Sequence, residues 1–392
     1  MNKPVLRPLA FVVIAASPIV AVVVACGSSS SGDDSSIVNV DGSADGTLLG
    51  RDGSSADASV ADGQVDKTPP CDNGLAVMSD AVSFAKTIGI CSNATTDGFG
   101  LVSAFFSKGF DQLDAAADAH FDAATYVIPS GLTVQAGLLP KFGDVIKPRE
   151  GNLLGLLSTG YAREFDGTDG GEQTFMGGPA LDGVDYPTGH APPGFPKASE
   201  GCPTNGDAND MIDVKLTLKA PADAHGFQFD YDFYASDWPD YVCTQFNDSF
   251  IAYVNSTTVH GDNVAFDAKN QPITVNIPFI DHCTIDAGVG CAGGEVPLDA
   301  GVFNSHCEAG TAELSGTGYG VTAPTACKKS TVSSRGASTG WLTTTVPISP
   351  GETFTLELMI WDNGDAYLDS SALVDNFQWI SSAPPIVTTR AK

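Results

Sequence analysis

Apolar and polar residues alternate along two neighbouring segments, and this alternation constrains the fold more than any other feature of the sequence. Residues 212–219 and 227–233 each place an apolar side chain at every second position for most of their length. This is the pattern of a strand with one buried face and one polar face. Pro221-Ala222-Asp223 between them is typical of a turn. The two segments are therefore predicted to be strands that pair in a hairpin or across a sandwich.

Short segments of the same kind recur towards the C-terminus, with Gly and Pro in the gaps between them. The further strands expected are residues 250–254, 273–279, 342–348, 354–361 and 372–379. Helical spacing is confined to residues 76–88 and, more weakly, 110–122, and Gly167–Gly206 is expected to be a long surface loop. We predict a mostly β fold, an antiparallel β-sandwich or jelly-roll-like domain with one or two short N-terminal helices and long loops.

The N-terminus has the features of a bacterial lipoprotein signal peptide. Lys3 and Arg7 precede an apolar run, Leu9–Ala25, whose last residues together with Cys26 read Val-Val-Ala-Cys. This ending is similar to a lipobox, and the run is short for a membrane-spanning helix. Cleavage before Cys26 and acylation of its thiol, with palmitate as one lipid, would leave a lipid-anchored protein. The alternative is an uncleaved N-terminal membrane helix.

Four regions follow from this interpretation. Residues 1–25 are the signal peptide, and residues 26–70 are the lipidated cysteine and a Gly/Ser/Asp linker without aromatic residues, which we expect to be disordered. Residues 71–382 are predicted to form the β-sandwich domain, and residues 383–392 a C-terminal tail. Because Gly27 rather than an aspartate follows the cysteine, we expect a lipid-anchored protein of the cell envelope, in the outer membrane, either periplasmic or surface-exposed.

Cysteine usage agrees with a compartment outside the cytoplasm. Setting Cys26 aside leaves an even number of cysteines, which in a secreted chain favours four disulfides. We predict Cys71–Cys91 first, because these residues flank one helix-like segment, and we expect the four cysteines from 283 to 327 to staple a loop-rich region. No CxxC spacing occurs, which argues against zinc ribbons and thioredoxin-type motifs. The cysteines expected in disulfides are Cys71, Cys91, Cys202, Cys243, Cys283, Cys291, Cys307 and Cys327.

The chain is strongly acidic, with a formal net charge of −28. Nucleic acids and anionic lipid surfaces would be repelled by such a chain, so we expect neither as a partner. The charge is compatible with divalent cations and with neutral or cationic ligands.

Carboxylates cluster near the C-terminus. Asp362, Asp365 and Asp369 lie within eight residues, with Gly364 at the turn, and Asp375 lies on the next expected strand. Clustered hard oxygen ligands are those that Ca²⁺ prefers, although the spacing is not that of an EF-hand. If the apolar residues around Asp375 face the core, Asp375 faces it too and needs a cation or several donors. Either calcium binds here, or Asp362 and Asp369 cap turns and Asp375 accepts backbone N–H bonds.

A second group of candidate residues lies between positions 235 and 250. Asn247 and Asp248 stand at the start of a strand, where they would complete the cation site or form an Asx-turn. Trp238 and Tyr241 lie in the same loop, and Trp361 ends a later strand. Such aromatic residues bind a sugar ring when they are exposed, and they plug the end of a sandwich when they are buried. The plug is the commoner arrangement.

Residues 227–250 and 340–379 together resemble the choice-of-anchor L domain family, and in particular its bacterial lipoprotein members of the myxobacterial type. The shorter pieces that carry the resemblance are residues 85–91, 148–151, 157–160, 246–248, 275–276, 307, 316–319, 340–342 and 375–377. They follow in order over about 300 residues. The resemblance implies a surface-displayed domain attached by whatever anchor the organism uses, and it implies no catalytic activity.

Two parts of the sequence depart from the family's pattern. The family's usual Ser-Glu-Glu-Tyr-Pro stretch is represented by Ser236-Asp237-Trp238-Pro239, which puts acidic ligands at this place in doubt. The insertion from Ala287 to Asp299, which carries Cys291, is specific to this chain.

Motifs for catalysis are weak. The six histidines form no HExxH or paired metal-binding spacing, and Ser158-Thr159-Gly160 lacks the GxSxG elbow. Asp230 and Asp232 share one strand face, which we expect to face solvent rather than to form a glycosidase pair. We predict a non-enzymatic cell-envelope lipoprotein that displays a calcium-stabilised β-sandwich for adhesion or for binding a ligand at the cell surface, either a glycan or a protein. The alternatives are a secreted or surface hydrolase with carboxylate catalysis, and a purely structural envelope component.

Overall fold

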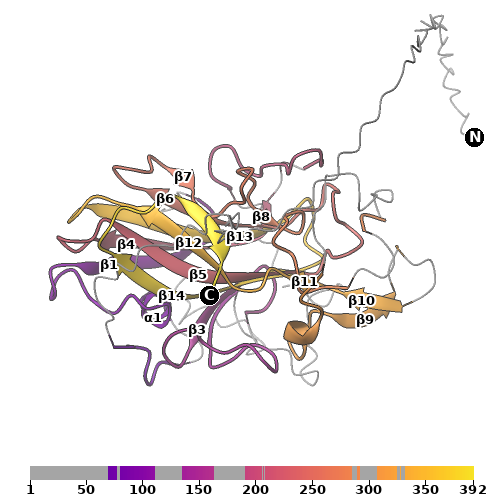
Figure 1. The fold of residues 1–392 in the computed structure, drawn as a ribbon, viewed down its shortest axis with the longest axis horizontal. Coiled ribbons are helices and arrows are strands. Elements are labelled where there is room, and N and C mark those ends of the chain that lie inside the picture. Colours follow the sequence, from indigo (N-terminus) through magenta and orange to yellow (C-terminus); the bar gives the residue numbers. More distant parts are fainter. Residues whose placement is uncertain are drawn as a thin grey trace, which may run out of the picture. The chain divides into compact units, whose positions relative to one another are not determined.

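The computed structural model describes residues 69–76, 80–110, 135–162, 190–204, 206, 208–284, 289–291, 307–324, 327 and 332–392 (Figure 1). The lipobox at Cys26, the linker, most of the 110–122 segment and most of the 287–299 insertion lie outside these residues. Within the described ranges, no helix has the length and apolar character needed to cross a membrane.

One antiparallel sheet has the strand order β1-β4-β13-β6-β7, with β8 paired to β6. Its strands are β1 (Gly100–Ser107), β4 (Ala208–Lys219), β6 (Ser249–Asn255), β7 (Asp262–Asn263), β8 (Ile273–Thr274) and β13 (Thr353–Asn363). The expected strand 273–279 ends after two residues because a turn follows, in which Ile277 N–H donates to the Thr274 carbonyl.

The other antiparallel sheet has the order β15-β12-β5-β14-β3-β2, with β11 paired to β5. Its strands are β2 (Ala136–Leu139), β3 (Leu154–Ser158), β5 (Gly226–Ala235), β11 (Ala337–Ser338), β12 (Leu342–Pro347), β14 (Ser370–Ile380) and β15 (Val387–Arg390). The tail expected at residues 383–392 thus contributes a strand, β15, which pairs with β12. A separate hairpin joins β9 (Val321–Pro324) to β10 (Val332–Arg335), and a short 3-10 helix spans Ala312–Leu314.

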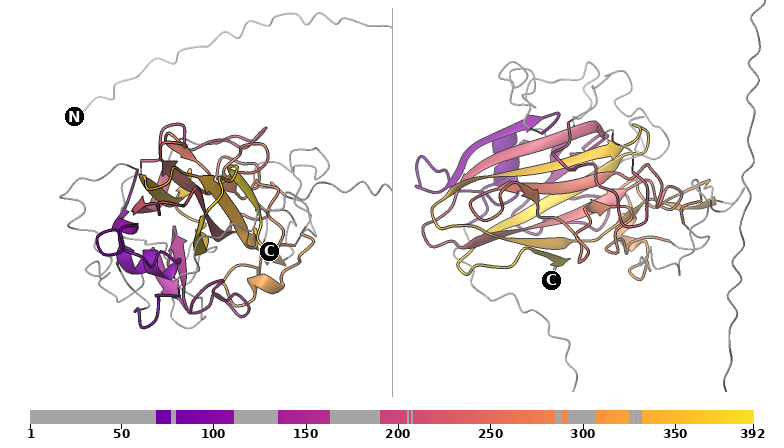
Figure 2. Two further views of the ribbon diagram at one scale, coloured as in Figure 1. Left: turned by 60° about the vertical axis from the view of Figure 1, so that its left-hand side comes forward. Right: turned by 90° about the horizontal axis from the view of Figure 1, so that it is seen from above.

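The two sheets pack face to face as a β-sandwich, so the predicted fold class is confirmed (Figures 1 and 2). The alternating residues of β4 and β5 explain the packing: Leu216 of β4 and Phe229 of β5 are fully buried in one apolar cluster. β4 and β5 belong to different sheets, so the turn at 221–223 joins strands across the sandwich rather than within a hairpin. Burial of these two apolar faces is the main stabilising term of such a fold.

Helix α1 (Ala81–Thr87) closes one open side of the sandwich, between the outer strands of the two sheets. Asp80 caps it, since its carboxylate accepts a hydrogen bond of 2.8 Å from the Ser83 N–H. Phe84 is fully buried and packs edge-on against Phe106 of β1, with ring centroids 5.9 Å apart. A side chain at Gly155 of β3 would lie 2.7 Å from the Phe84 ring, so glycine is needed there.

Four disulfides connect the eight cysteines, as predicted from their even number. Cys71–Cys91 brackets α1, which confirms the first predicted pair. The four cysteines from 283 to 327 pair among themselves, as Cys283–Cys307 and Cys291–Cys327. The remaining bond, Cys202–Cys243, joins two loops.

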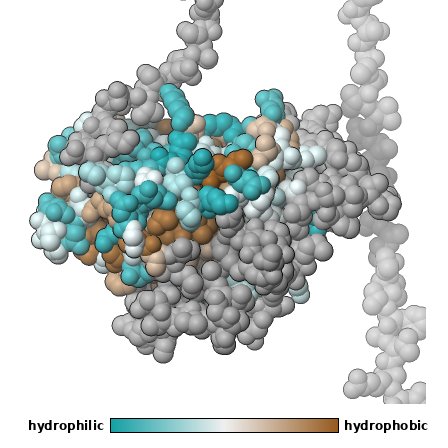
Figure 3. Space-filling view, turned by 90° about the horizontal axis from the view of Figure 1, so that it is seen from below, coloured by the Kyte–Doolittle hydropathy of each residue, from teal (hydrophilic) through white to brown (hydrophobic). Residues whose placement is uncertain are grey.

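Hydrophilic residues dominate the described part of the face shown in Figure 3, where apolar residues form a narrower band. The large apolar side chains that are most exposed in the described residues are Val82, Val102, Phe105, Val145 and Tyr367.

Strand β14 contains an irregularity that decides the environment of Asp375. The register between β14 and β5 shifts between Asp375 and Gln378, and Asn376 has a positive φ of 56°. The shift breaks the alternation, so Val374 and Phe377 both reach the main core while Asp375 lies opposite Asp230. Asp375 is fully buried and accepts backbone hydrogen bonds from Arg149, Glu150 and Asn376, at 2.6, 3.2 and 2.6 Å, as one of the two sequence interpretations expected.

The Asp375→Asn variant tests this environment through pH. Burial raises the pKa of Asp375 to about 7, against the opposing effect of the backbone donors. Because the unfolded value is about 4, the folded protein binds the extra proton between about pH 4 and pH 7, so this residue lowers the free energy of unfolding as pH rises through that window. We expect the free energy of unfolding of Asp375→Asn to decrease less steeply between about pH 4 and pH 7 than that of the unmodified protein. Guanidinium unfolding at several pH values measures this slope. Asp223→Asn, at an exposed turn, controls for the lost charge, and an equal slope in all three proteins would contradict the assignment.

Candidate functional site

Antiparallel pairing brings several acidic residues together at one end of the sandwich. The start of β6 meets the end of β13, where Ser249 pairs with Trp361, and the start of β14 meets the end of β5, where Ser370 pairs with Ala235. The loops and strand ends at these points carry aspartate and asparagine. We call this group the acidic chamber, and it consists of Asp237, Asn247, Asp248, Asp362, Asn363 and Asp369.

The carboxylates of the acidic chamber are enclosed by the protein. Asp237, Asp248, Asp362 and Asp369 are exposed by 2, 3, 1 and 2 %. A side chain at Gly160, beyond the end of β3, would lie 2.1 Å from Asp369 Oδ2, so the backbone there approaches this carboxylate closely. Carboxylates as deeply buried as these are rare unless they are paired or bind a cation.

Hydrogen bonding leaves several of these buried oxygens without a partner. Asp248 is satisfied in part, because it accepts from the Ser370 hydroxyl at 2.6 Å and from the Asn363 N–H at 3.1 Å. Among the described residues, no partner is found for either carboxylate oxygen of Asp362, or for the side-chain amide of Asn247. The same holds for one oxygen each of Asp237, Asn363 and Asp369. Each buried polar group without a partner lowers the free energy of unfolding by about 1–3 kcal/mol, and by more when the group is charged.

The electrostatics of the chamber oppose ionisation of its own carboxylates. Burial raises the pKa of Asp362 well above its usual value, and the charges of Asp248, Asp369 and Asp210 raise it further. Burial likewise raises the pKa of Asp369, with Asp210 and Asp248 as the neighbouring charges. The pKa of Asp248 rises to about 7, again mainly by burial. A divalent cation among these groups would reverse the effect, because it favours the charged form.

The donor set of the chamber fits a hard cation. Ca²⁺ takes six to eight oxygen ligands from carboxylates, amide carbonyls, backbone and water. The chamber offers the unpartnered oxygens of Asp362, Asp369, Asn247 and Asn363, and none of these is a soft ligand. In the described chain, no three His, Cys, Asp or Glu side chains already stand around one point as metal ligands do. Side chains would therefore have to turn towards an ion on binding.

The structure brings together four of the six residues predicted as metal ligands, namely Asp362, Asp369, Asn247 and Asp248. Asp365 is half-buried at the edge of the chamber, where its charge acts on Asp237 and Asp248. Asp375 lies apart from the chamber, further along β14, and is held by backbone donors.

The structure also shows residues that the sequence analysis did not assign to the cation site. In the sequence, Asp237 stands out only as a departure from the family pattern, and Asn363 has no feature that marks it as a ligand. Both lie at the ends of strands whose neighbours carry the predicted ligands, β5 and β13. What marks Asp237 and Asn363 as candidate ligands is their position at the same end of two antiparallel strand pairs. This position is known only once the strand order is known.

The predicted aromatic ligand-binding residues lie mainly inside the protein. Trp238 and Trp361 are fully buried, so neither ring offers a face to a ligand. Trp238 Nε1 donates a hydrogen bond of 3.1 Å to the Thr284 carbonyl, as a plug of the sandwich end would. Tyr241 is half-buried and packs edge-on against Phe246, at 5.6 Å between ring centroids. The aspartates expected to face solvent, Asp230 and Asp232, are also buried.

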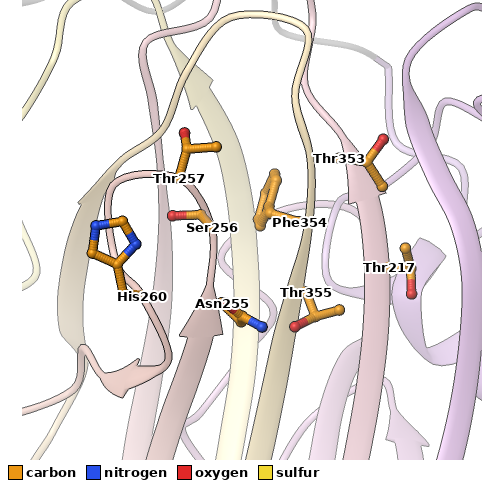
Figure 4. A pocket seen from close by; sticks show the side chains of 8 residues that line it. All are labelled: Thr217, Asn255, Ser256, Thr257, His260, Thr353, Phe354 and Thr355. Carbon is orange, nitrogen blue, oxygen red and sulfur yellow. The ribbon is translucent and has the colours of Figure 1, made fainter.

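An open groove of about 530 Å³ lies at the other end of β13 (Figure 4). Thr355 of β13 pairs with Thr217 of β4 on one side and with Asn255 of β6 on the other, so three polar side chains form a row across the sheet. The groove is lined by Thr217, Asn255, Ser256, Thr257, His260, Thr353, Phe354 and Thr355. Only His260 among these eight residues can carry a charge, which sets this groove apart from the strongly acidic chain as a whole.

Comparison with known proteins agrees with this architecture. The family model of the choice-of-anchor L domain matches residues 216–376, from within β4 to within β14. The match therefore includes strands of both sheets and all six residues of the acidic chamber. No curated protein and no solved structure matches the chain. The match to a choice-of-anchor L domain over residues 216–376 and the four disulfides, which persist in oxidising compartments, together indicate an extracellular or cell-surface protein.

Proposed function

We propose that this protein is a non-enzymatic, lipid-anchored component of the cell envelope that displays a calcium-stabilised sandwich for adhesion or ligand binding. The observation that carries the proposal is the acidic chamber, whose buried carboxylate and amide oxygens are left without partners. A bound Ca²⁺ would satisfy them and would neutralise the mutual repulsion of Asp248, Asp362 and Asp369. Outside the cytoplasm, free calcium is abundant enough to fill such a site.

Calcium should raise the melting temperature, and EDTA should lower it. A ligand that binds only the folded state at 100 times its dissociation constant contributes about 2.7 kcal/mol, which corresponds to a shift of several degrees. We expect Asp362→Asn to abolish the calcium-dependent shift. In EDTA the same variant should be at least as stable as the unmodified protein, because it removes a buried carboxyl group whose ionisation is opposed by burial and by Asp248 and Asp369. Differential scanning calorimetry with and without calcium measures both effects.

Asp375→Asn is the matched control for this experiment. It removes a second buried carboxyl group from β14, the next strand along the chain, but Asp375 lies outside the chamber. We expect this variant to keep the full response to calcium. An unmodified protein that is indifferent to EDTA, or equal responses of the two variants, would contradict the calcium site.

Enclosure of the chamber supports a non-enzymatic role over the hydrolase alternative. Glycosidase carboxylates flank a substrate that must reach them from solvent. Asp248, Asp362 and Asp369 are almost fully buried, so a chain of sugars has no access to them. Their arrangement favours a structural ion.

The groove at the other end of β13 is the place where we propose that a ligand binds. Its hydroxyl and amide groups offer hydrogen bonds without charge, and the row Thr217, Thr355 and Asn255 repeats them across neighbouring strands. A neutral polyhydroxylated ligand, such as a glycan, matches this chemistry. An anionic ligand would meet the repulsion of the whole chain.

Replacement of groove residues should remove glycan binding and leave stability unchanged. We expect the double variant Asn255→Ala, Thr355→Val to lose binding at least about tenfold on a glycan array and in titration calorimetry, because two hydrogen bonds are lost at about 1 kcal/mol each. Thr389→Val, at an exposed position of β15 on the other sheet, is the control. The glycan proposal fails if no neutral glycan binds, or if both variants bind as the unmodified protein does.

The lipid anchor is proposed from Cys26 and the sequence that precedes it. Cys26→Ser should prevent incorporation of labelled palmitate and leave residues 1–25 attached, which mass spectrometry of the N-terminal peptide measures. The neighbouring Ser28→Ala is the control, since it leaves the lipobox intact. An unmodified protein that keeps residues 1–25 and incorporates no palmitate would favour an uncleaved membrane helix.

A further inference from the structure

Lys108 and Gln135 meet where the outer strands of the two sheets lie beside each other. Lys108 follows β1, the edge strand of one sheet, and Gln135 precedes β2, the edge strand of the other. Lys108 Nζ is in contact with Gln135 Oε1. The two side chains therefore connect the sheets at an edge that no disulfide spans in the described chain.

The carboxamide of Gln135 is held in a fixed orientation. The residue is only 1 % exposed. Its Nε2 donates to the Thr159 carbonyl at 2.9 Å and to the Asp210 carbonyl at 2.5 Å. With both amide hydrogens engaged, the carbonyl group faces Lys108. Because a C=O bond is about 1.2 Å long, the distance from the amine nitrogen to the carbonyl carbon exceeds its distance to this oxygen by at most about 1.2 Å.

The amine of Lys108 is set up as a nucleophile. Burial lowers its pKa to about 7, although the charge of Asp210 acts in the opposite direction. This pKa lies close to neutral pH, where a sizeable share of the molecules carries the neutral, nucleophilic form of the amine. The fixed contact replaces a bimolecular encounter by an intramolecular one, which raises the effective concentration of the two groups by several orders of magnitude.

We propose that Lys108 and Gln135 react with each other to form an intramolecular isopeptide bond between the two sheets. Nζ of Lys108 attacks Cδ of Gln135, a C–N bond forms, and the Cδ–Nε2 bond breaks. The amine proton passes to the departing nitrogen, which leaves as ammonia, and the Asp210 carboxyl beside Lys108 serves as the proton shuttle. The atoms balance without an oxidant, a reductant or a second substrate.

The bond would complete the covalent bracing of the sandwich. Cys71–Cys91 ties the ends of the α1 segment, and the other disulfides tie loops. The isopeptide bond would close the chain between residues 108 and 135 and prevent β1 and β2 from separating. An edge joined in this way resists peeling, which suits a domain displayed outside the cell.

Mass spectrometry of the purified protein, reduced and alkylated, tests the bond directly. We expect an intact mass lower by one ammonia than the sequence predicts, and no tryptic cleavage after Lys108. Digestion at the aspartates between positions 111 and 122 should give a branched pair of peptides joined at Lys108 and Gln135. Cleavage after Lys108 at full mass would overturn the proposal and leave a hydrogen bond only.

Two variants separate this reaction from other losses of ammonia, such as succinimide formation at Asn-Gly sequences. Lys108→Arg keeps the positive charge but should restore the full mass. Lys141→Arg, which replaces a lysine that donates to the Gly143 carbonyl, should keep the loss. The same mass deficit in Lys108→Arg would refute the assignment. If Lys108→Arg does not fold, peptide mapping of the unmodified protein decides the question alone.

Discussion

Burial of two apolar sheet faces against each other is the constraint on which the rest of this structure depends. Once Leu216 of β4 and Phe229 of β5 share one core, the order of the strands in each sheet fixes which strand ends meet. The end of β13 then lies beside the start of β6, and the end of β5 beside the start of β14. The acidic chamber is a consequence of this arrangement, because its residues occupy those ends.

The apolar core stabilises the folded sandwich, whereas the buried carboxyl groups at one end of it destabilise the fold. Burial and the neighbouring carboxyl groups oppose ionisation of Asp248, Asp362 and Asp369, and this opposition destabilises the charged form of each group. A protein tolerates such groups when a ligand compensates them or when the remaining core is large enough. The disulfides add to the core, since three of them join loops and Cys283, Cys243 and Cys307 lie in or against the main apolar cluster.

Local patterns predicted the strands well where alternation was regular, and failed where backbone irregularities intervened. The register shift at Asp375 turned this residue away from the cation site suggested by its sequence neighbours, and no periodicity reveals a positive φ at Asn376. The sequence leaves two interpretations of Trp238 and Trp361, because it does not distinguish a buried ring that plugs the sandwich end from an exposed ring that binds a sugar; both rings are buried. Strand β15 was missed because its four residues form a strand only by pairing with β12.

The sequence by itself determined the β-sandwich class, the family, four disulfides with Cys71–Cys91 among them, and an Asp-rich segment near the C-terminus. These properties follow from local composition, periodicity and cysteine number. Only the tertiary structure decided which acids share the chamber, that Asp237 and Asn363 join them, and that Lys108 meets Gln135 across the edges of two sheets. The physical reason is that contacts between distant segments depend on strand order and register, which core packing sets and local sequence does not encode.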